Sequence, residues 1–195
     1  MLLIMGLIDI FMLGILSTSY EVGVYRIALK LSLFTSFTLS AVNSIAAPKF
    51  SELYWNGDNK KLKYVTKFSS KIIFFTSFPV FIIILFYGKF LLSVFGTAFV
   101  AGYTALVILS SGQLINASCG PIGTLMNMVG KQKEFMIITV ISVIINIILN
   151  YILILKFQSI GAAIATTIST IIINISTSFV VYKNFGYWVG YPSIR

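Results

Sequence analysis

The 195-residue sequence predicts an all-α integral membrane protein that crosses the bilayer six times. Hydrophobic residues make up 58% of the chain and charged residues only 10%, whereas charged residues make up about 25% of a typical soluble domain. A hydrocarbon core about 30 Å thick needs about 20 helical residues per crossing, so this length accommodates six crossings with short loops. A single-pass receptor and a peripheral enzyme are therefore excluded.

Long apolar runs define the six predicted spans. The first run is the shortest, and it lacks the positive n-region and small-residue cleavage site of a secretory signal peptide, so we expect a span whose beginning is missing. The spans are predicted at residues 2–17, 24–47, 70–92, 104–128, 134–155 and 160–182. They form a single lobe over residues 1–183, with a cytoplasmic loop at 48–69 and a cytoplasmic tail at 184–195.

Turn and proline residues predict local features of these spans. Pro79 in the third span and Pro121 in the fourth are expected to kink their helices, because proline removes a backbone hydrogen bond. The Asn-Gly-Asp triplet at 56–58 is a predicted turn. Its last residue, Asp58, is the predicted N-cap of a lysine-rich helix that runs into the third span.

The distribution of lysine and arginine predicts the orientation, because short loops rich in these residues stay in the cytoplasm. Ten of them lie in or next to the connections after spans two, four and six, and only Lys89 and Lys156 lie at or next to the connections on the opposite side. Both termini are therefore predicted to be cytoplasmic. Topology also accounts for the net charge of +9, so no nucleic-acid partner is expected. The ten residues are Lys49, Lys60, Lys61, Lys63, Lys67, Lys71, Lys131, Lys133, Lys183 and Arg195.

The chain has few groups for covalent chemistry. It contains no histidine, the single cysteine Cys119 and five carboxylates, too few for a zinc site, histidine acid–base catalysis or a disulfide framework. It also lacks the glycine spacing of a phosphate-binding loop. We therefore expect a transporter or lipid-handling protein and not an enzyme, with no cofactor, no metal site and no catalytic residue.

Asp9, Arg26 and Lys30 are the charged residues predicted to lie inside the bilayer. Asp9 is eight residues from the outer end of its span, about 12 Å deep by helical rise, where a short carboxylate cannot reach the surface. Arg26 and Lys30 are four residues apart and share a helical face.

An antiparallel hairpin of the first two spans, turning over residues 17–23, places Lys30 level with Asp9 and predicts an ion pair. That pair either lines a substrate cavity or only holds two helices together. Arg26 lies nearer the outer surface, where it either faces the cavity or extends to the headgroups.

Asparagines also fall within predicted spans, among them Asn43, Asn116, Asn146, Asn150 and Asn174. Asparagine in hydrocarbon more often hydrogen-bonds across a helix interface than binds a substrate. We therefore expect packing roles, and a polar cavity is the alternative.

Nine short segments follow one another along the chain: DIFMLG at 9–14, EVGVY at 21–25, ALKL at 28–31, AVNSIAAP at 41–48, FSELY at 50–54, LSVFG at 92–96, GQLIN at 112–116, NIILN at 146–150 and IGAAIAT at 160–166. In order and spacing they resemble the second half of the polysaccharide flippases of the O-antigen and capsule type. Those proteins belong to a superfamily that also holds the lipid II flippases and the multidrug and toxin extrusion antiporters.

The resemblance implies one lobe of a two-lobe transporter with 12–14 helices around a central cavity. This chain would correspond to the second lobe alone and would begin inside the seventh span. A truncated reading frame, a frameshifted remnant and a half-protein that pairs with a separate N-terminal six-helix lobe are all compatible with that correspondence.

The resemblance also implies the substrate: an oligosaccharide linked through pyrophosphate to a polyprenol, carried by alternating access to the outer leaflet of a bacterial cytoplasmic membrane. Arg26 and Lys30 would bind the anionic pyrophosphate among membrane lipids, since fixed positive charges offset its desolvation. Asp9 would serve as counter-ion or as the group that binds a coupling ion, H⁺ or Na⁺. The alternatives are a cation-coupled multidrug antiporter and a non-transporting remnant; one deep acid beside two cations favours the flippase.

Overall fold

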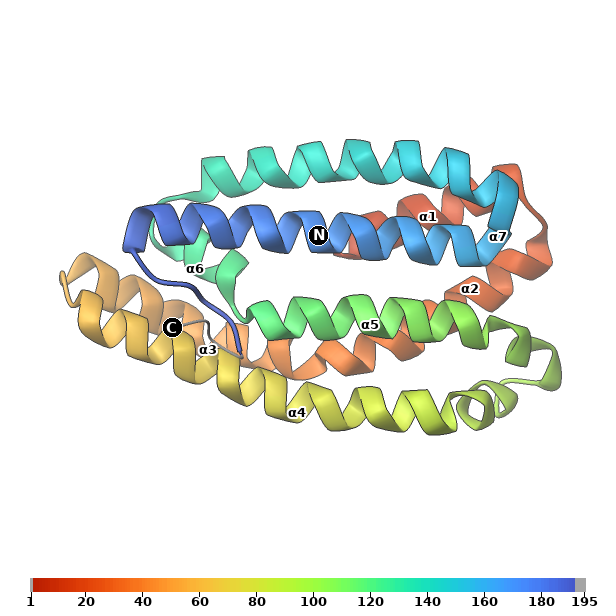
Figure 1. The fold of residues 1–195 in the computed structure, drawn as a ribbon, viewed down its shortest axis with the longest axis horizontal. Helices are drawn as coiled ribbons and strands as arrows, with labels where there is room; N and C mark the ends of the chain where they lie inside the picture. Colours follow the sequence, from red (N-terminus) through yellow and green to blue (C-terminus); the bar gives the residue numbers. More distant parts are fainter. Residues whose placement is uncertain (1, 192–195) are drawn as a thin grey trace.

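The computed structural model describes residues 2–191, and this part of the chain is built of helices without strands (Figure 1). The predicted all-α membrane fold is confirmed. Four helices are long and apolar enough to cross a membrane, and a shorter apolar helix precedes them. The elements are α1 (Leu2–Leu16), α2 (Ser19–Ser32), the 3₁₀ helix η1 (Leu33–Ser36), α3 (Phe37–Trp55), α4 (Asn59–Ser93), the 3₁₀ helix η2 (Thr97–Gly102), α5 (Tyr103–Cys119), α6 (Ile122–Met128) and α7 (Gln132–Phe185).

The turn between α1 and α2 is shorter than the sequence suggested. Thr18 is the N-cap of α2, and its hydroxyl accepts a hydrogen bond from the Glu21 backbone N–H. Glu21 lies in the first helical turn, where its carboxylate interacts favourably with the positive end of the helix dipole. As a result α2 begins at Ser19 and not at residue 24. It continues through η1 into α3, so the second predicted span is helical with a tighter 3₁₀ turn near its middle.

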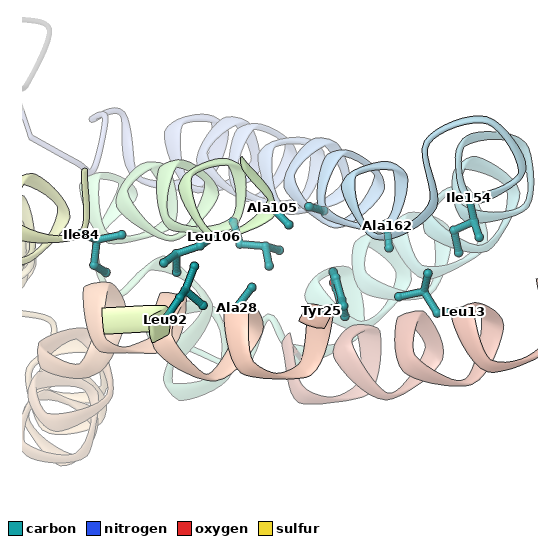
Figure 2. Packing of buried hydrophobic residues seen from close by; sticks show 11 residues of the cluster. Leu13, Tyr25, Ala28, Ile84, Leu92, Ala105, Leu106, Ile154 and Ala162 are labelled. Atoms are coloured by element: carbon teal, nitrogen blue, oxygen red, sulfur yellow. The ribbon is translucent and has the colours of Figure 1, made fainter. Parts of the chain in front are cut away.

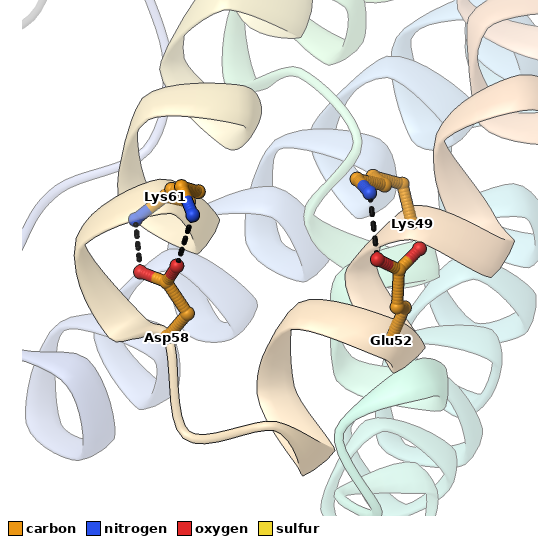
Figure 3. Close-up of polar contacts among 4 residues, drawn as sticks. All are labelled: Lys49, Glu52, Asp58 and Lys61. Carbon is orange, nitrogen blue, oxygen red and sulfur yellow. Dashed lines mark hydrogen bonds and ion pairs between the residues drawn. The ribbon is translucent and has the colours of Figure 1, made fainter.

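The cytoplasmic loop predicted at 48–69 is almost entirely helical. Only residues 56–58 separate α3 from α4, and Gly57 has a φ of +75°, a conformation that glycine adopts without steric cost. Asp58 is the N-cap of α4, as predicted: its carboxylate accepts from the Lys61 backbone N–H at 3.1 Å and pairs with the Lys61 ammonium at 2.8 Å (Figure 3). The hydrogen bond from Lys61 lowers the pKa of Asp58. A second exposed pair, Lys49 with Glu52, lies on the last turns of α3.

The fourth predicted span is interrupted, because α5 ends at Cys119 and α6 begins at Ile122. Between them Gly120 has φ 72° and ψ −157°, a conformation essentially restricted to glycine. A Cβ at Gly120 would lie 2.0 Å from the hydroxyl of Ser70 on α4, so packing against α4 also requires glycine at position 120. Pro121 follows and removes a further backbone donor. The kink predicted at Pro121 is therefore a complete break, whereas Pro79 lies inside the continuous helix α4.

The fifth and sixth predicted spans form the two arms of α7, which reverses direction at Gln158 (φ 50°, ψ −126°). We call residues 132–157 the first arm and residues 159–185 the second arm. The arms approach closely beside the bend, since a Cβ at Gly161 would lie 2.2 Å from the Leu153 carbonyl oxygen. Figure 1 shows the arms as an extended hairpin.

Three apolar clusters among the described residues hold the helices together, and two of them are large. The first includes Leu13, Tyr25 and Leu106 with the small residues Ala28 and Ala162, which let backbones approach (Figure 2). The second lies toward the α3–α4 turn. Large apolar side chains on the outer faces stay exposed, which suits a lobe whose solvent is lipid.

The described part of the predicted tail folds back onto the lobe. After α7 ends, Tyr187 and Val189 are buried, and the Tyr191 N–H donates to the Ser118 carbonyl oxygen at 2.8 Å. The Tyr191 ring packs against Phe74 of α4. The remainder of the tail, 192–195, lies outside the described residues.

Replacing Gly120 tests whether α4 enforces the break. Gly120→Ala should lower the free energy of unfolding by about 3 kcal/mol or more, because backbone strain and the clash with Ser70 add together. Gly57→Ala is the matched control: its φ is also positive, but no atom lies within 4 Å of the added Cβ, so strain alone should cost about 1 kcal/mol. Titrating both variants with sodium dodecyl sulfate in mixed micelles measures the difference. Equal losses would show that α4 does not enforce the break.

Candidate functional site

A buried cluster of hydrogen-bonding side chains surrounds Asp9. Its carboxylate accepts from the Tyr25 hydroxyl at 2.6 Å, from the Asn150 amide at 2.6 Å and from the Thr166 hydroxyl. Asn146 donates to Thr166 at 3.2 Å and accepts from Asn150 at 3.1 Å. We call these five residues the Asp9 cluster. It joins α1, α2 and both arms of α7, and its members are at most 3% exposed.

The Asp9 cluster contains one carboxyl group and no basic residue. The ion pairs of the described residues join other side chains, so neutral donors alone surround the carboxylate. The Asn150 amide oxygen is buried and accepts no hydrogen bond from the described residues. Carboxylate, amide and hydroxyl oxygens are the ligands that hard cations prefer. The cluster can therefore hold a proton or a small cation, either of which would remove the cost of burying the charge.

The predicted ion pair between Asp9 and Lys30 is wrong. Because α2 begins at Ser19 and the expected turn extended to residue 23, the α2 residues level with Asp9 shift by about five positions, about 7 Å of helical rise, toward Tyr25. Tyr25 also lies on the buried face of α2, whereas Lys30 is exposed. A neutral hydroxyl therefore replaces the expected ammonium.

Arg26 and Lys30 both lie on the exposed surface of α2, one helical turn apart. Neither forms an ion pair within residues 2–191. Charged side chains within membrane-spanning segments face a bundle interior or a water-filled cavity, or they reach the interface. The lobe thus presents two adjacent cations to its surroundings.

The asparagines take different roles. Asn174 donates to Asn116 at 3.1 Å and joins the second arm of α7 to α5, which is the packing role expected for amides in hydrocarbon. Asn146 and Asn150 belong to the Asp9 cluster. The Asn43 amide oxygen is buried and has no hydrogen-bond partner among the described residues.

A cavity of about 520 Å³, lined by both polar and apolar residues, lies beside the break between α5 and α6. We call it the α5–α6 cavity; η1, α3 and the two arms of α7 complete its walls. Its lining includes Asn43, Asn116, Asn127, Asn174 and Thr177.

The sequence reading missed Tyr25, Thr166 and Thr177. Polar residues recur along the second arm at a helical spacing, with Thr166 and Thr170 followed by Asn174. This stripe was a readable signal for a buried polar face. Tyr25 had no such signal, since a single tyrosine in an apolar span is typical of packing.

A protein family described as MatE matches residues 1–152 of the chain. The chain is 31% identical over 167 residues to the "Probable low-salt glycan biosynthesis flippase Agl15" of Haloferax volcanii, covering 83% of this chain and 34% of that protein. It is 29% identical over 161 residues to the "Capsular polysaccharide biosynthesis protein CapF" of Staphylococcus aureus, covering 80% of this chain and 40% of that protein. The matched region thus spans well under half the length of these curated relatives. No solved structure matches the chain.

Removing the Tyr25 hydroxyl tests the Asp9 cluster. Tyr25→Phe should lower the free energy of unfolding by about 2 kcal/mol, because a buried charged group loses a hydrogen bond. Tyr20→Phe is the control: its hydroxyl bonds the Ala98 carbonyl oxygen at an exposed site and should contribute under about 1 kcal/mol. Detergent-mediated unfolding compares the two. Equal effects would show that Asp9 does not need the Tyr25 donor.

Proposed function

Because the chain belongs to the MatE family, we propose that it forms one six-helix lobe of a flippase for polyprenyl-pyrophosphate-linked oligosaccharide in a bacterial cytoplasmic membrane. The names of the two relatives support a glycan substrate. The substrate moves to the outer leaflet by alternating access and is not chemically altered, so this is transport and not catalysis.

The observation that carries this proposal is the pair of exposed cations on α2. Arg26 and Lys30 are neighbours on one helical face, about 6 Å apart along the axis. They lie about 10 and 16 Å from the start of α2 by helical rise, well inside a bilayer. A pyrophosphate carries more than one negative charge, and two fixed cations at this spacing offset its desolvation. Arg26 and Lys30 therefore bind the pyrophosphate.

The Asp9 cluster supplies the coupling ion site in this proposal. A proton or Na⁺ at Asp9 neutralises the carboxylate, and the neutral group no longer needs three hydrogen-bond donors. Those donors come from α2 and from both arms of α7. Binding and release of the ion thus change the contacts that hold α1 in the lobe, which is how an ion gradient would drive alternating access.

The proposed orientation places both termini in the cytoplasm. The α3–α4 turn, the α6–α7 connection and the end of α7 lie together at one end of the lobe, and the α1–α2 turn and the Gln158 bend lie at the other (Figure 1). The first end holds the lysine-rich connections, as the positive-inside rule requires of a cytoplasmic face. The partner of this lobe is an N-terminal six-helix lobe that completes the central cavity.

A cation-coupled multidrug antiporter is the second candidate. The observation that favours it is the absence of an ammonium beside Asp9 in the described residues, since an unpaired carboxylate can bind a cation. The two exposed cations of α2 and the glycan-related names of the relatives favour the flippase.

Loss of the α2 cations tests the flippase proposal. The chain is expressed with and without its upstream coding region in a flippase-deficient bacterial strain, and surface polysaccharide is measured. Lys30→Ala should reduce the restored surface polysaccharide to under about a tenth of the amount restored by the unsubstituted chain, because the pyrophosphate site loses one of its two fixed positive charges. Lys156→Ala, an exposed lysine two residues before the Gln158 bend, should retain it. No restoration by either form, or full restoration by Lys30→Ala, would contradict the proposal.

Ion binding at Asp9 is tested on the purified chain. If Na⁺ is the coupling ion, it should raise the unfolding temperature relative to choline, because a ligand that binds only the folded state stabilises it. Asp9→Asn should abolish this rise, whereas Asp58→Asn, at an exposed pair, should retain it. If the proton is the coupling ion, acidification should produce an Asp9-dependent rise instead. Absence of both the Na⁺ effect and the acidification effect would contradict ion coupling at Asp9.

A further inference from the structure

The α5–α6 cavity, with a mixed polar and apolar lining, is a further candidate site, separate from the Asp9 cluster and from the exposed cations of α2. Eight of its lining residues are polar and uncharged, and none of the described residues that line it is charged. Its volume of about 520 Å³ falls within the range of about 300–1,000 Å³ typical of small-molecule sites.

The cavity follows from the break in the fourth span. Gly120 and Pro121 end α5 and displace α6, so no continuous helix fills the space between α3 and α7. The lining changes from mouth to floor: Phe37 is 69% exposed at the mouth, whereas Thr177 is completely buried at the floor. The cavity is thus a recess that opens at the surface of the lobe.

Two residues that line this recess carry unsatisfied polar atoms. The Thr177 hydroxyl and the Asn43 amide oxygen are buried and have no hydrogen-bond partner among the described residues. Thr177 lies about 27 Å along the second arm from its start at Ser159, in the half of the lobe nearer the α3–α4 turn. An unpartnered polar group in a membrane protein costs free energy unless water or a ligand completes its bonds. These two atoms therefore point to a polar ligand.

The chemistry of the lining selects the ligand class. A pyrophosphate needs cationic partners, and none of the described lining residues is cationic. A polyprenol chain needs an apolar lining, and this lining also contains amides and hydroxyls. Amides and hydroxyls donate to and accept from sugar hydroxyls. The aromatic rings of Phe37 and Phe135 supply apolar surface for the C–H faces of a sugar ring. A neutral saccharide matches both features.

We propose that the α5–α6 cavity binds neutral sugar residues of the transported glycan, close to their pyrophosphate link. The proposal rests on the flippase function only for the source of the saccharide. The α2 helix continues through η1 into α3, and Phe37 is seven residues beyond Lys30, about 10 Å by helical rise. A pyrophosphate at Lys30 therefore leaves its first sugars within reach of the cavity, on the side toward the α3–α4 turn.

Saturation-transfer NMR on the purified chain tests this proposal without any transport step. The chain is held in lauryldimethylamine oxide, a detergent without sugar, and the probes are cellobiose, maltose, mannobiose and N,N′-diacetylchitobiose. At least one probe should bind, and inorganic pyrophosphate should not displace it. No binding by any probe, or displacement by pyrophosphate, would overturn the proposal.

Two variants locate the binding site. Thr177→Val should weaken binding by about three- to tenfold, the loss of one hydrogen bond. Thr35→Val is the matched control, because Thr35 is also fully buried and unpartnered but does not line the cavity; it should leave binding unchanged. Ser40→Trp, at an exposed position of the mouth, should block binding even if Thr177→Val does not fold. Binding that persists in Ser40→Trp would overturn the assignment.

Failure of this proposal is distinguishable from failure of the flippase function. Disaccharide binding that is lost in Ser40→Trp supports the cavity even if no form of the chain restores surface polysaccharide. Conversely, restoration that is lost in Lys30→Ala but complete in Ser40→Trp would leave the flippase standing and overturn the cavity.

Discussion

The burial of one carboxylate is the constraint on which the arrangement of α1, α2 and α7 depends. Apolar contacts cannot discriminate between helix arrangements in lipid as they do in water, because lipid tails are as apolar as leucine. Asp9 can discriminate, since its charge needs several donors at once. Those donors come from Tyr25 on α2, Asn150 on the first arm of α7 and Thr166 on the second. The short α1–α2 turn and the sharp bend at Gln158 bring these three segments to one point.

The sequence predicts the features of this fold that depend on local signals. The apolar runs, the turn at 56–58 and the Asp58 cap are each encoded within a few residues, and all three are present. The order of short segments identified the family, which the MatE match confirms. The end of α3 at Trp55 was not predictable in this way, because hydropathy marks where the bilayer ends and not where the helix ends. The lysine-rich start of α4, in contrast, followed from the Asp58 cap.

The candidate site was predicted in part. Asp9 stood out because a deep carboxylate is rare. Its partner depended on the exact length of the α1–α2 turn, and an error of a few residues in that length led to Lys30 being predicted where the structure has Tyr25. The asparagines are alike in sequence, and only the tertiary structure separates their roles. Asn116 and Asn174 bond each other across two helices, whereas the Asn43 oxygen has no partner among the described residues. The cavity between them exists because Gly120 breaks a helix, and local signals alone predicted only a kink there.

The return of residues 187–191 along α4 has a mechanical consequence. The Tyr191 N–H bonds the Ser118 carbonyl oxygen, beside the break at Gly120, while the other end of this short strap continues directly from α7. The segment is held at both ends, by its covalent link to α7 and by this hydrogen bond. Tilting of the end of α7 would therefore be transmitted to the break at Gly120. A force applied to the polypeptide beyond residue 191 would reach the wall of the cavity before it reached the helices that face lipid.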